Sequence, residues 1–227
     1  MATQTTAQLS ATLGLRVEDP AELKFTEDMK ESALNRGQRQ VAQLLDPMYL
    51  TELQDVQASV MDGGADLYLS FTQLETDSSA TILNGSQSII AVKDGEGWLH
   101  KTTLSEQIRL QNTLLAGGST NTVYYVFDEK IYISNGQGES DTVTVYFLKA
   151  PTTMAVDGTA PVINECLYDI MLRFAEAILW RADDELKRAE VAYEEAMEYI
   201  DFLNQLAIAR RPRGIGTKSQ ERAKVQG

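Results

Sequence analysis

The sequence is poor in the residues that cross-link or catalyse. It has one cysteine, Cys166, and one histidine, His100, among 227 residues. One cysteine excludes a disulfide within the chain, which fits a reducing cytoplasm or a particle assembled there. No apolar run approaches the roughly 20 residues that span a bilayer. The N-terminal MATQTTAQLS lacks the basic and apolar regions of a secretory signal. These absences predict a soluble protein with no membrane partner.

The same scarcity leaves no obvious catalytic centre. A lone histidine beside Trp98 and Lys101 does not make a Ser-His-Asp arrangement, so we expect His100 to be structural or exposed to solvent. Cys166 stands beside Leu167 in an apolar pattern, which predicts a small buried hydrophobic residue rather than a nucleophile. The sequence therefore predicts no enzyme, no cofactor and no metal site.

Negative charge dominates the chain but is unevenly distributed. The formal net charge is −13, and residues 210–227 contain six bases and one acid, hence +5. Residues 1–209 therefore carry −18. A body this acidic repels nucleic acid, because non-specific binding needs bases that replace counterions on phosphates. Only the C-terminal segment has the charge to bind phosphate.

The C-terminal segment has few large apolar residues and contains Pro212, Gly214 and Gly216. Such a composition cannot bury enough apolar surface to order itself. We therefore expect a flexible basic arm that becomes ordered on a partner. Its candidate binding residues are Arg210, Arg211, Arg213, Lys218, Arg222 and Lys224.

Residues 1–62 show a helical pattern. Thr26 is a predicted N-cap, and the two acids that follow it suit the first turn of a helix. An amphipathic stripe continues to Leu45, and Asp46-Pro47 ends this helix. A second, shorter helix is predicted by four apolar residues at helical spacing: Leu50, Leu53, Val56 and Val60.

Residues 63–150 change to a period of two, which predicts an inserted antiparallel β domain. Asp128-Glu129 is a predicted tight hairpin loop, and residues 135–138 are predicted to form the next turn. For residues 99–118, strand, short helix and loop are all compatible with the sequence. Alternating aromatic residues indicate sheet core, with a stacking platform for bases or sugars as the alternative. The predicted strands are 67–71, 88–93, 123–127, 130–134 and 141–149.

Residues 151–209 predict one long helix, or two helices that meet near Ala182-Asp183. Pro161 is expected in the first helical turn. From Ala182 a heptad seam predicts packing against another helix, in the same chain or a neighbouring one. The seam residues are Ala182, Leu186, Ala189, Tyr193, Ala196, Ile200 and Leu203.

The opposite face of this helix is acidic. The commoner explanation is a solvated helix surface, with pairing to Lys187 and Arg188. The functional alternative is a surface along which DNA slides, because it offers phosphates nothing to bind. A metal site is disfavoured, since adjacent acids point in different directions and no histidine supports them. The candidate channel-facing acids are Asp183, Asp184, Glu190, Glu194, Glu195 and Glu198.

Together these patterns predict an α+β fold. N-terminal helices pack with a long C-terminal helix or helix pair, and an antiparallel β domain is inserted between them. Residues 1–62 and 151–209 form the helical core, residues 63–150 the β domain, and residues 210–227 the flexible arm.

Four segments, in this order, carry a family resemblance. They are FTEDMKESALNRGQRQVAQLLDPMYLTEL, a β insertion with YYVFDEKIYIS, the strand VTVYFLKAP, and a helix that opens PVINECLYDIMLRFAEAILW. This order resembles the head–tail adaptor (connector, or head-completion) proteins of tailed double-stranded DNA bacteriophages. The resemblance covers residues 25–206.

The resemblance implies a virion structural protein without a cofactor, assembled in the host cytoplasm and placed at the head–tail interface. Such adaptors form a ring of neighbouring copies, commonly twelve, below the portal protein. The ring extends the channel through which double-stranded DNA passes without specific binding. It also offers a docking platform to a tail tube, nozzle or tail-hub protein. The C-terminal segment of such adaptors often reaches the portal, a role that the arm from Arg210 fits.

Two other functions are compatible with the residues. One is an oligomeric binding module of a phage fibre or baseplate, in which the β domain recognises carbohydrate or peptide from a helical stalk. Such a stalk has no use for a basic arm after its helix. The other is a small DNA-packaging subunit, against which the charge of −18 on residues 1–209 stands.

Overall fold

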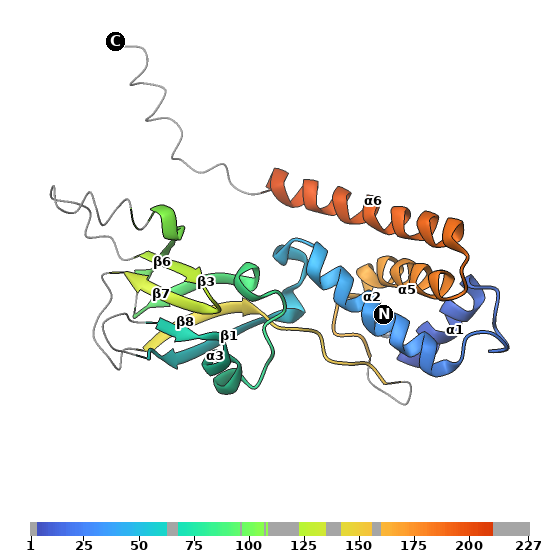
Figure 1. The fold of residues 1–227 in the computed structure, drawn as a ribbon, viewed down its shortest axis with the longest axis horizontal. Helices are drawn as coiled ribbons and strands as arrows, with labels where there is room; N and C mark the ends of the chain where they lie inside the picture. Colours follow the sequence, from blue (N-terminus) through green and yellow to red (C-terminus); the bar gives the residue numbers. More distant parts are fainter. Residues whose placement is uncertain are drawn as a thin grey trace, which may run out of the picture.

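The protein is elongated, with a helical domain at one end and a β domain at the other (Figure 1). A computed structural model describes residues 4–62, 68–95, 97–106, 108, 123–134, 142–155 and 160–210. Each domain has its own hydrophobic core, one among the helices and one between two β-sheets. The predicted α+β fold class is thereby confirmed.

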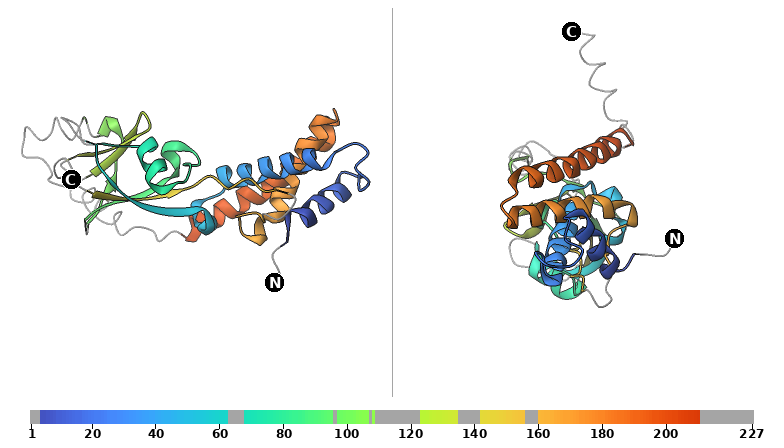
Figure 2. Two further views of the ribbon diagram at one scale, coloured as in Figure 1. Left: turned by 90° about the horizontal axis from the view of Figure 1, so that it is seen from below. Right: turned by 90° about the vertical axis from the view of Figure 1, so that its right-hand side faces the viewer.

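The helical domain is built around one central helix. Its helices are α1 (Thr6–Arg16), α2 (Glu27–Leu44), α5 (Tyr168–Ala182) and α6 (Leu186–Arg210). Helix α5 packs against both α2 and α6, and α1 contacts α2 and α5. Figure 2 shows α2 and α6 on different sides of α5. The two ends of the described chain therefore share one core.

Both N-terminal helices begin at threonine caps. The Thr26 hydroxyl accepts a hydrogen bond from the Met29 N–H, which confirms the predicted start of α2. Helix α1 was not predicted from the sequence. Thr5 and Gln8 form a reciprocal capping box at its start, and its residues Leu9 and Leu13 are fully buried.

Helix α5 begins later than predicted. Asn164, not Pro161, caps this region: its side-chain oxygen accepts from the Cys166 N–H at 3.0 Å and opens a short 3₁₀ turn, η4 (Glu165–Leu167). Pro161 lies buried in the extended connector that leads from the β domain to this turn. A proline has no N–H to donate, so it fits an extended segment as well as a first helical turn.

Two amide side chains of α2 hold the connector. Asn35 bonds both backbone groups of Met154, accepting from its N–H at 2.7 Å and donating to its carbonyl at 3.0 Å. Buried Gln38 donates to the Thr152 carbonyl at 3.1 Å and accepts from the Val162 N–H at 2.9 Å. These bonds give hydrogen-bond partners to backbone N–H and carbonyl groups of the connector, which lies outside both sheets.

The predicted alternative of two C-terminal helices is the observed one. The chain turns between Ala182 and Leu186, and α6 packs back on α5. The heptad seam is buried at Ala189, Ala196 and Ile200, so its predicted helix partner is α5 of the same chain. Ala182 and Leu186 are exposed, because they lie at the turn.

The β domain is formed by two four-stranded sheets. Sheet A has the order β1 (Gln54–Val60), β8 (Thr142–Leu148), β3 (Ile89–Asp94) and β4 (Gly97–Trp98). Sheet B has the order β2 (Tyr68–Ser70), β7 (Lys130–Ser134), β6 (Val123–Phe127) and β5 (His100–Lys101). Strand pairs are antiparallel except β5 with β6. Helix α3 (Phe71–Ser78) adds Phe71 and Leu74 to their core.

The β6–β7 hairpin is confirmed residue by residue. Asp128 and Glu129 form its turn with φ of 50° and 54°. Two successive positive φ values are typical of the type I′ turn that matches strand twist. Strands β3 and β8 also lie within a residue of their predicted ends, whereas Phe71 begins a helix rather than ending a strand. The predicted turn at residues 135–138 lies outside the described residues.

The predicted second helix was wrong. Leu50 and Leu53 are buried around two 3₁₀ turns, η1 (Pro47–Tyr49) and η2 (Thr51–Leu53), and the chain then extends into β1. Strand β1 pairs with β8 along its whole length. Val56 and Val60 are 51% and 54% exposed, so they do not form the buried stripe that a helix required. Pairing with a distant strand outweighed local spacing.

The segment at residues 99–118, for which strand, short helix and loop were all compatible, contains strand β5 at His100–Lys101 and is helical at residues 104–106. Residues 109–118 lie outside the described part of the chain. A further 3₁₀ turn, η3 (Gly85–Ser88), precedes β3.

Candidate interaction surfaces

The single histidine and the single cysteine are both at the surface. His100 is exposed on β5, as expected. Cys166 is exposed, so its predicted burial was wrong. The turn capped by Asn164 directs Leu167 and Tyr168, rather than Cys166, into the core. Among the described residues no group of three His, Cys, Asp or Glu side chains could hold a metal ion. No described helix is long and apolar enough to cross a membrane.

The six candidate channel-facing acids differ in their ion pairing and in their exposure to solvent. Asp183 forms an ion pair with Lys24, and Glu195 pairs with Arg173 at 3.0 Å. Asp184 is exposed in the α5–α6 turn with a φ of 60°. The other three are exposed and follow one another at intervals of four residues along α6: Glu190, Glu194 and Glu198. Residues four apart lie on the same helix face, so these three form a line.

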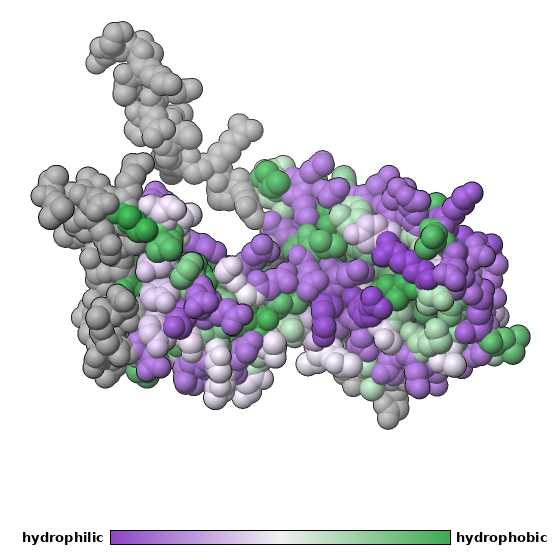
Figure 3. Space-filling model, in the orientation of Figure 1, coloured by the Kyte–Doolittle hydropathy of each residue, from purple (hydrophilic) through white to green (hydrophobic). Residues whose placement is uncertain are grey.

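Aromatic rings accompany this line of acids. Tyr199 and Phe202 are 55% and 58% exposed on α6, and Asp201 adds another acid. Figure 3 shows hydrophobic patches among the polar residues that cover most of this view. Exposed aromatic rings are typical of surfaces that contact another protein. We name Glu190, Glu194, Glu198, Tyr199, Asp201 and Phe202 the α6 outer face.

Helix α2 presents a different surface. Arg36 and Arg39 are exposed on it, and residues 32–44 contain no acid. Both arginines line a shallow depression of 400 Å³ together with Ser32, Asn35 and Thr153 of the connector. Asp28 and Glu31 close its N-terminal end. We name Ser32, Arg36 and Arg39 with this depression the α2 outer face.

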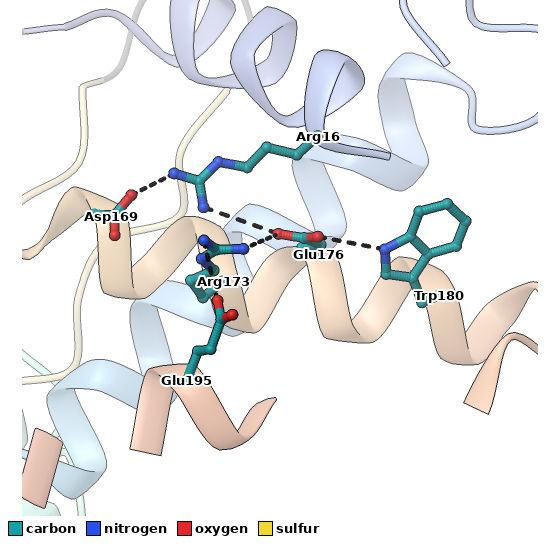
Figure 4. Close-up of polar contacts among 6 residues, drawn as sticks. All are labelled: Arg16, Asp169, Arg173, Glu176, Trp180 and Glu195. Carbon is teal, nitrogen blue, oxygen red and sulfur yellow. Dashed lines mark hydrogen bonds and ion pairs between the residues drawn. The ribbon is translucent and has the colours of Figure 1, made fainter. Parts of the chain in front are cut away.

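An ion-pair network joins three helices beside the α6 outer face (Figure 4). Glu176 of α5 lies at its centre, with a side chain only 12% exposed. It accepts from Arg173 at 3.3 Å and from the Trp180 indole N–H at 3.4 Å, and Arg16 of α1 lies 3.9 Å away. Arg16 also pairs with Asp169. Because Arg173 continues to Glu195 of α6, the network positions α1 and α6 relative to α5.

A groove of 460 Å³ runs between α5 and α6 at this network. Asp169 and Arg173 line it on the α5 side. The α6 side adds two acids, Glu195 and Glu198, and two rings, Tyr199 and Phe202. Arg173 forms ion pairs with Glu176 and Glu195, and the two exposed rings add apolar surface to the charged lining. The groove is suited to contact with another macromolecule.

Asp19 organises the loop between α1 and α2. Its carboxylate accepts from the N–H groups of Phe25 at 2.7 Å, Leu23 at 2.9 Å and Lys24 at 3.0 Å. The hydrogen bond from Phe25 is the largest cause that lowers the pKa of Asp19 below its usual value, with the other two N–H groups and Lys30 acting in the same direction against desolvation. Buried Lys30 donates to the Asp19 carbonyl at 3.3 Å. This loop is therefore rigidly built at the end of the helical domain.

Sheet A has an outward face that carries exposed apolar residues. Tyr146 of β8 lies opposite both Val56 of β1 and Ala91 of β3. The ring of Trp98, 64% exposed, lies 5.2 Å from that of Tyr146. Val60 extends the patch along β1. We name Val56, Val60, Ala91, Trp98 and Tyr146 the sheet A outer face.

Sequence reasoning did not single out Tyr199, Phe202 or Trp98. Tyr199 and Phe202 fall outside the heptad seam, which was the available signal that they point away from the core. No comparable signal marked Trp98, because its exposure depends on the register of β4 with β3. Of the basic arm, the structure describes only Arg210, exposed at the end of α6. Arg211, Arg213, Lys218, Arg222 and Lys224 lie outside the described residues.

Comparison with known proteins identifies the family. The model of the SU10 adaptor protein family matches residues 4–221, nearly the whole chain. No curated protein matches the sequence at a significant level. A match of this extent includes both domains and their connector, so it applies to the architecture as a whole. The chain therefore belongs to the SU10 adaptor protein family and is a structural adaptor protein of a bacteriophage virion.

Proposed function

We propose that this adaptor acts at the head–tail interface, where copies form a ring below the portal, extend the DNA channel and provide the docking platform for the tail. One observation carries the proposal beyond the family. The elongated molecule exposes aromatic surfaces on both of its domains, the α6 outer face and the sheet A outer face. A ring subunit between two other assemblies needs several such surfaces at once.

The basic arm is proposed to bind the portal. It begins at Arg210, where α6 ends exposed, and residues 211–227 add five bases and one acid. Charge of this sign speeds the encounter with an acidic surface and fixes the orientation of binding. The sheet A outer face, in the other domain, is then available to a tail tube, nozzle or tail-hub protein.

The acidic body suits a channel wall. Residues 1–209 carry −18, and an exposed acid such as Asp184, which pairs with no cation among the described residues, offers nothing to phosphates. We propose that exposed acids of this region face the channel and that double-stranded DNA passes them without specific binding. Asp183 and Glu195 are less suited to this role, because Lys24 and Arg173 neutralise them.

A second function has one observation in its favour. Trp98 beside Tyr146 resembles the aromatic platforms on which sugars or peptide side chains stack. In a binding module of a fibre or baseplate this pair would be the site of recognition, and the basic arm would have no role in assembly.

Removing residues 211–227 separates the two functions. We expect the truncated chain to keep its unfolding midpoint, because the described cores end before Arg210. Its affinity for purified portal rings of the same phage, measured by co-sedimentation, should fall by about tenfold or more. The matched control keeps the length of the arm but replaces Arg211, Arg213, Lys218, Arg222 and Lys224 by Gln. An unchanged affinity in both variants would exclude the arm as the portal-binding element.

A further inference from the structure

A ring subunit needs two different contact surfaces, and the helical domain has two candidates, the α2 outer face and the α6 outer face. Helix α5 packs between α2 and α6, so the α2 outer face and the α6 outer face are on different sides of one subunit (Figures 1 and 2). A closed ring is made by a heterologous contact, in which one patch of each copy meets a different patch of the next. The two faces are therefore candidates for the two halves of that contact.

The charges of the two faces are complementary where the arginines lie, beyond the two acids, Asp28 and Glu31, that close the N-terminal end of the depression. The α6 outer face presents Glu194 and Glu198 four residues apart, and the α2 outer face presents Arg36 and Arg39 three residues apart. Side chains at either spacing are about 5–6 Å apart on a helix surface. Two acids of one helix can thus meet two arginines of another at the same time.

The shapes and the aromatic side chains of the two faces are complementary as well. Tyr199 and Phe202 project from α6 beside the acids, each more than half exposed. The α2 outer face is hollowed by the 400 Å³ depression that Arg36 and Arg39 line. A guanidinium stacks on an aromatic face and also pairs with a carboxylate, so the arginines suit both kinds of neighbour.

From these observations we infer that the α6 outer face of one copy docks on the α2 outer face of the next, with Glu194 and Glu198 against Arg36 and Arg39 of the neighbouring copy. This inference rests on the ring of the proposed function. It places Glu194 and Glu198 at the subunit contact and leaves Asp184, in the α5–α6 turn, as a channel-facing acid.

Charge reversal and its rescue test the pairing. Full-length chains with Arg36→Glu and Arg39→Glu, or with Glu194→Arg and Glu198→Arg, are each mixed with portal rings and imaged by electron microscopy. We expect either pair to raise the concentration needed for ring formation about tenfold or more, and a chain carrying all four changes to recover rings. Asp77→Arg with Glu106→Arg is the control, because both residues are exposed and lie outside the helical domain. Unfolding midpoints show that each variant is folded.

Cross-linking tests the contact without depending on energetics. Cys166 is first replaced by Ser, and copies with Arg39→Cys are mixed with copies with Glu198→Cys on portals. A disulfide-linked dimer, formed by oxidation and absent when either variant is used alone, supports the inference. Rings that form without this cross-link, and that charge reversal leaves intact, overturn the contact while leaving the proposed function in place. The absence of rings from the unmodified protein overturns both.

Discussion

Glu176 is the residue on which the arrangement of three helices depends. Its carboxylate is largely buried and meets Arg173, Trp180 and Arg16 at once. Asp169 is 55% exposed and pairs, among the described residues, with Arg16 alone. Removing one acceptor of buried donors leaves the donors unsatisfied. We expect Glu176→Gln to lower the free energy of unfolding by about 2 kcal/mol. Asp169→Asn, the matched control, should lower it by less than about 1 kcal/mol. Urea denaturation measures both, and equal losses would show that Glu176 is not the centre of the network.

Asp19 gives the protein a defined sensitivity to acid. Its pKa is lowered in the folded state, first by the Phe25 N–H, so its contribution to stability is present above the unfolded pKa of about 3.9. That contribution is lost as the pH falls through the lower, folded pKa. The stability difference between the unmodified chain and Asp19→Asn should therefore be constant above about pH 5 and shrink toward pH 2.

Urea midpoints at four or five pH values test this dependence. Asp77→Asn is the control, because Asp77 is exposed on α3 and the replacement changes the charge equally. A difference between Asp19→Asn and the unmodified chain that does not change with pH would assign the role of Asp19 to packing rather than to its charge.

At the scale of elements, Gly37 sets the distance between α2 and α5. A Cβ at this position would lie 2.6 Å from the Met171 carbonyl oxygen and 3.3 Å from the Ala175 backbone nitrogen. Alanine in place of glycine favours a helix by about 1 kcal/mol, but overpacking of this kind costs about 1–3 kcal/mol. We expect Gly37→Ala to destabilise the protein on balance.

The unfolding midpoint in urea, compared with that of Ser32→Ala, measures this effect. Ser32 is exposed on the same helix, so its replacement reports helix propensity alone. A Gly37→Ala variant as stable as Ser32→Ala would mean that α2 and α5 can move apart at this position without a loss of stability.

Elements with a local signal were predictable, and elements that depend on distant partners were not. The Asp128-Glu129 turn determines the β6–β7 hairpin within a few residues, and Thr26 caps α2 by itself. Strand β1 instead depends on β8, and its Val56 pairs with Tyr146, which is 90 residues away in the sequence. A spacing of Leu and Val that suits a helix could not reveal this. Helix α1 is an exception, because the Thr5 and Gln8 of its capping box are a local signal that was overlooked, while its short apolar pattern is buried only by packing on α2 and α5.

The candidate site shows the same division. The acids of α6 were identified from composition, but their separation into paired and exposed groups depends on partners such as Lys24 for Asp183. The exposed positions of Tyr199 and Phe202 follow from which side of α6 packs on α5. Local sequence thus predicts where charge accumulates, whereas tertiary packing decides which charges remain available.

The whole molecule is elongated, with one hydrophobic core in each of its two domains, and each domain exposes aromatic residues. Membership of the SU10 adaptor protein family identifies the protein as a structural adaptor of the virion. We propose that this adaptor forms a ring between portal and tail. It combines the acidic body, the basic arm and the two outer faces of the helical domain in one assembly.

The most direct test is negative-stain electron microscopy of full-length protein mixed with portal rings of the same phage. Our account predicts a second ring stacked coaxially on each portal, with the copy number visible in top views. Portals that remain bare at saturating protein, or that bind scattered single copies without a ring, would contradict it.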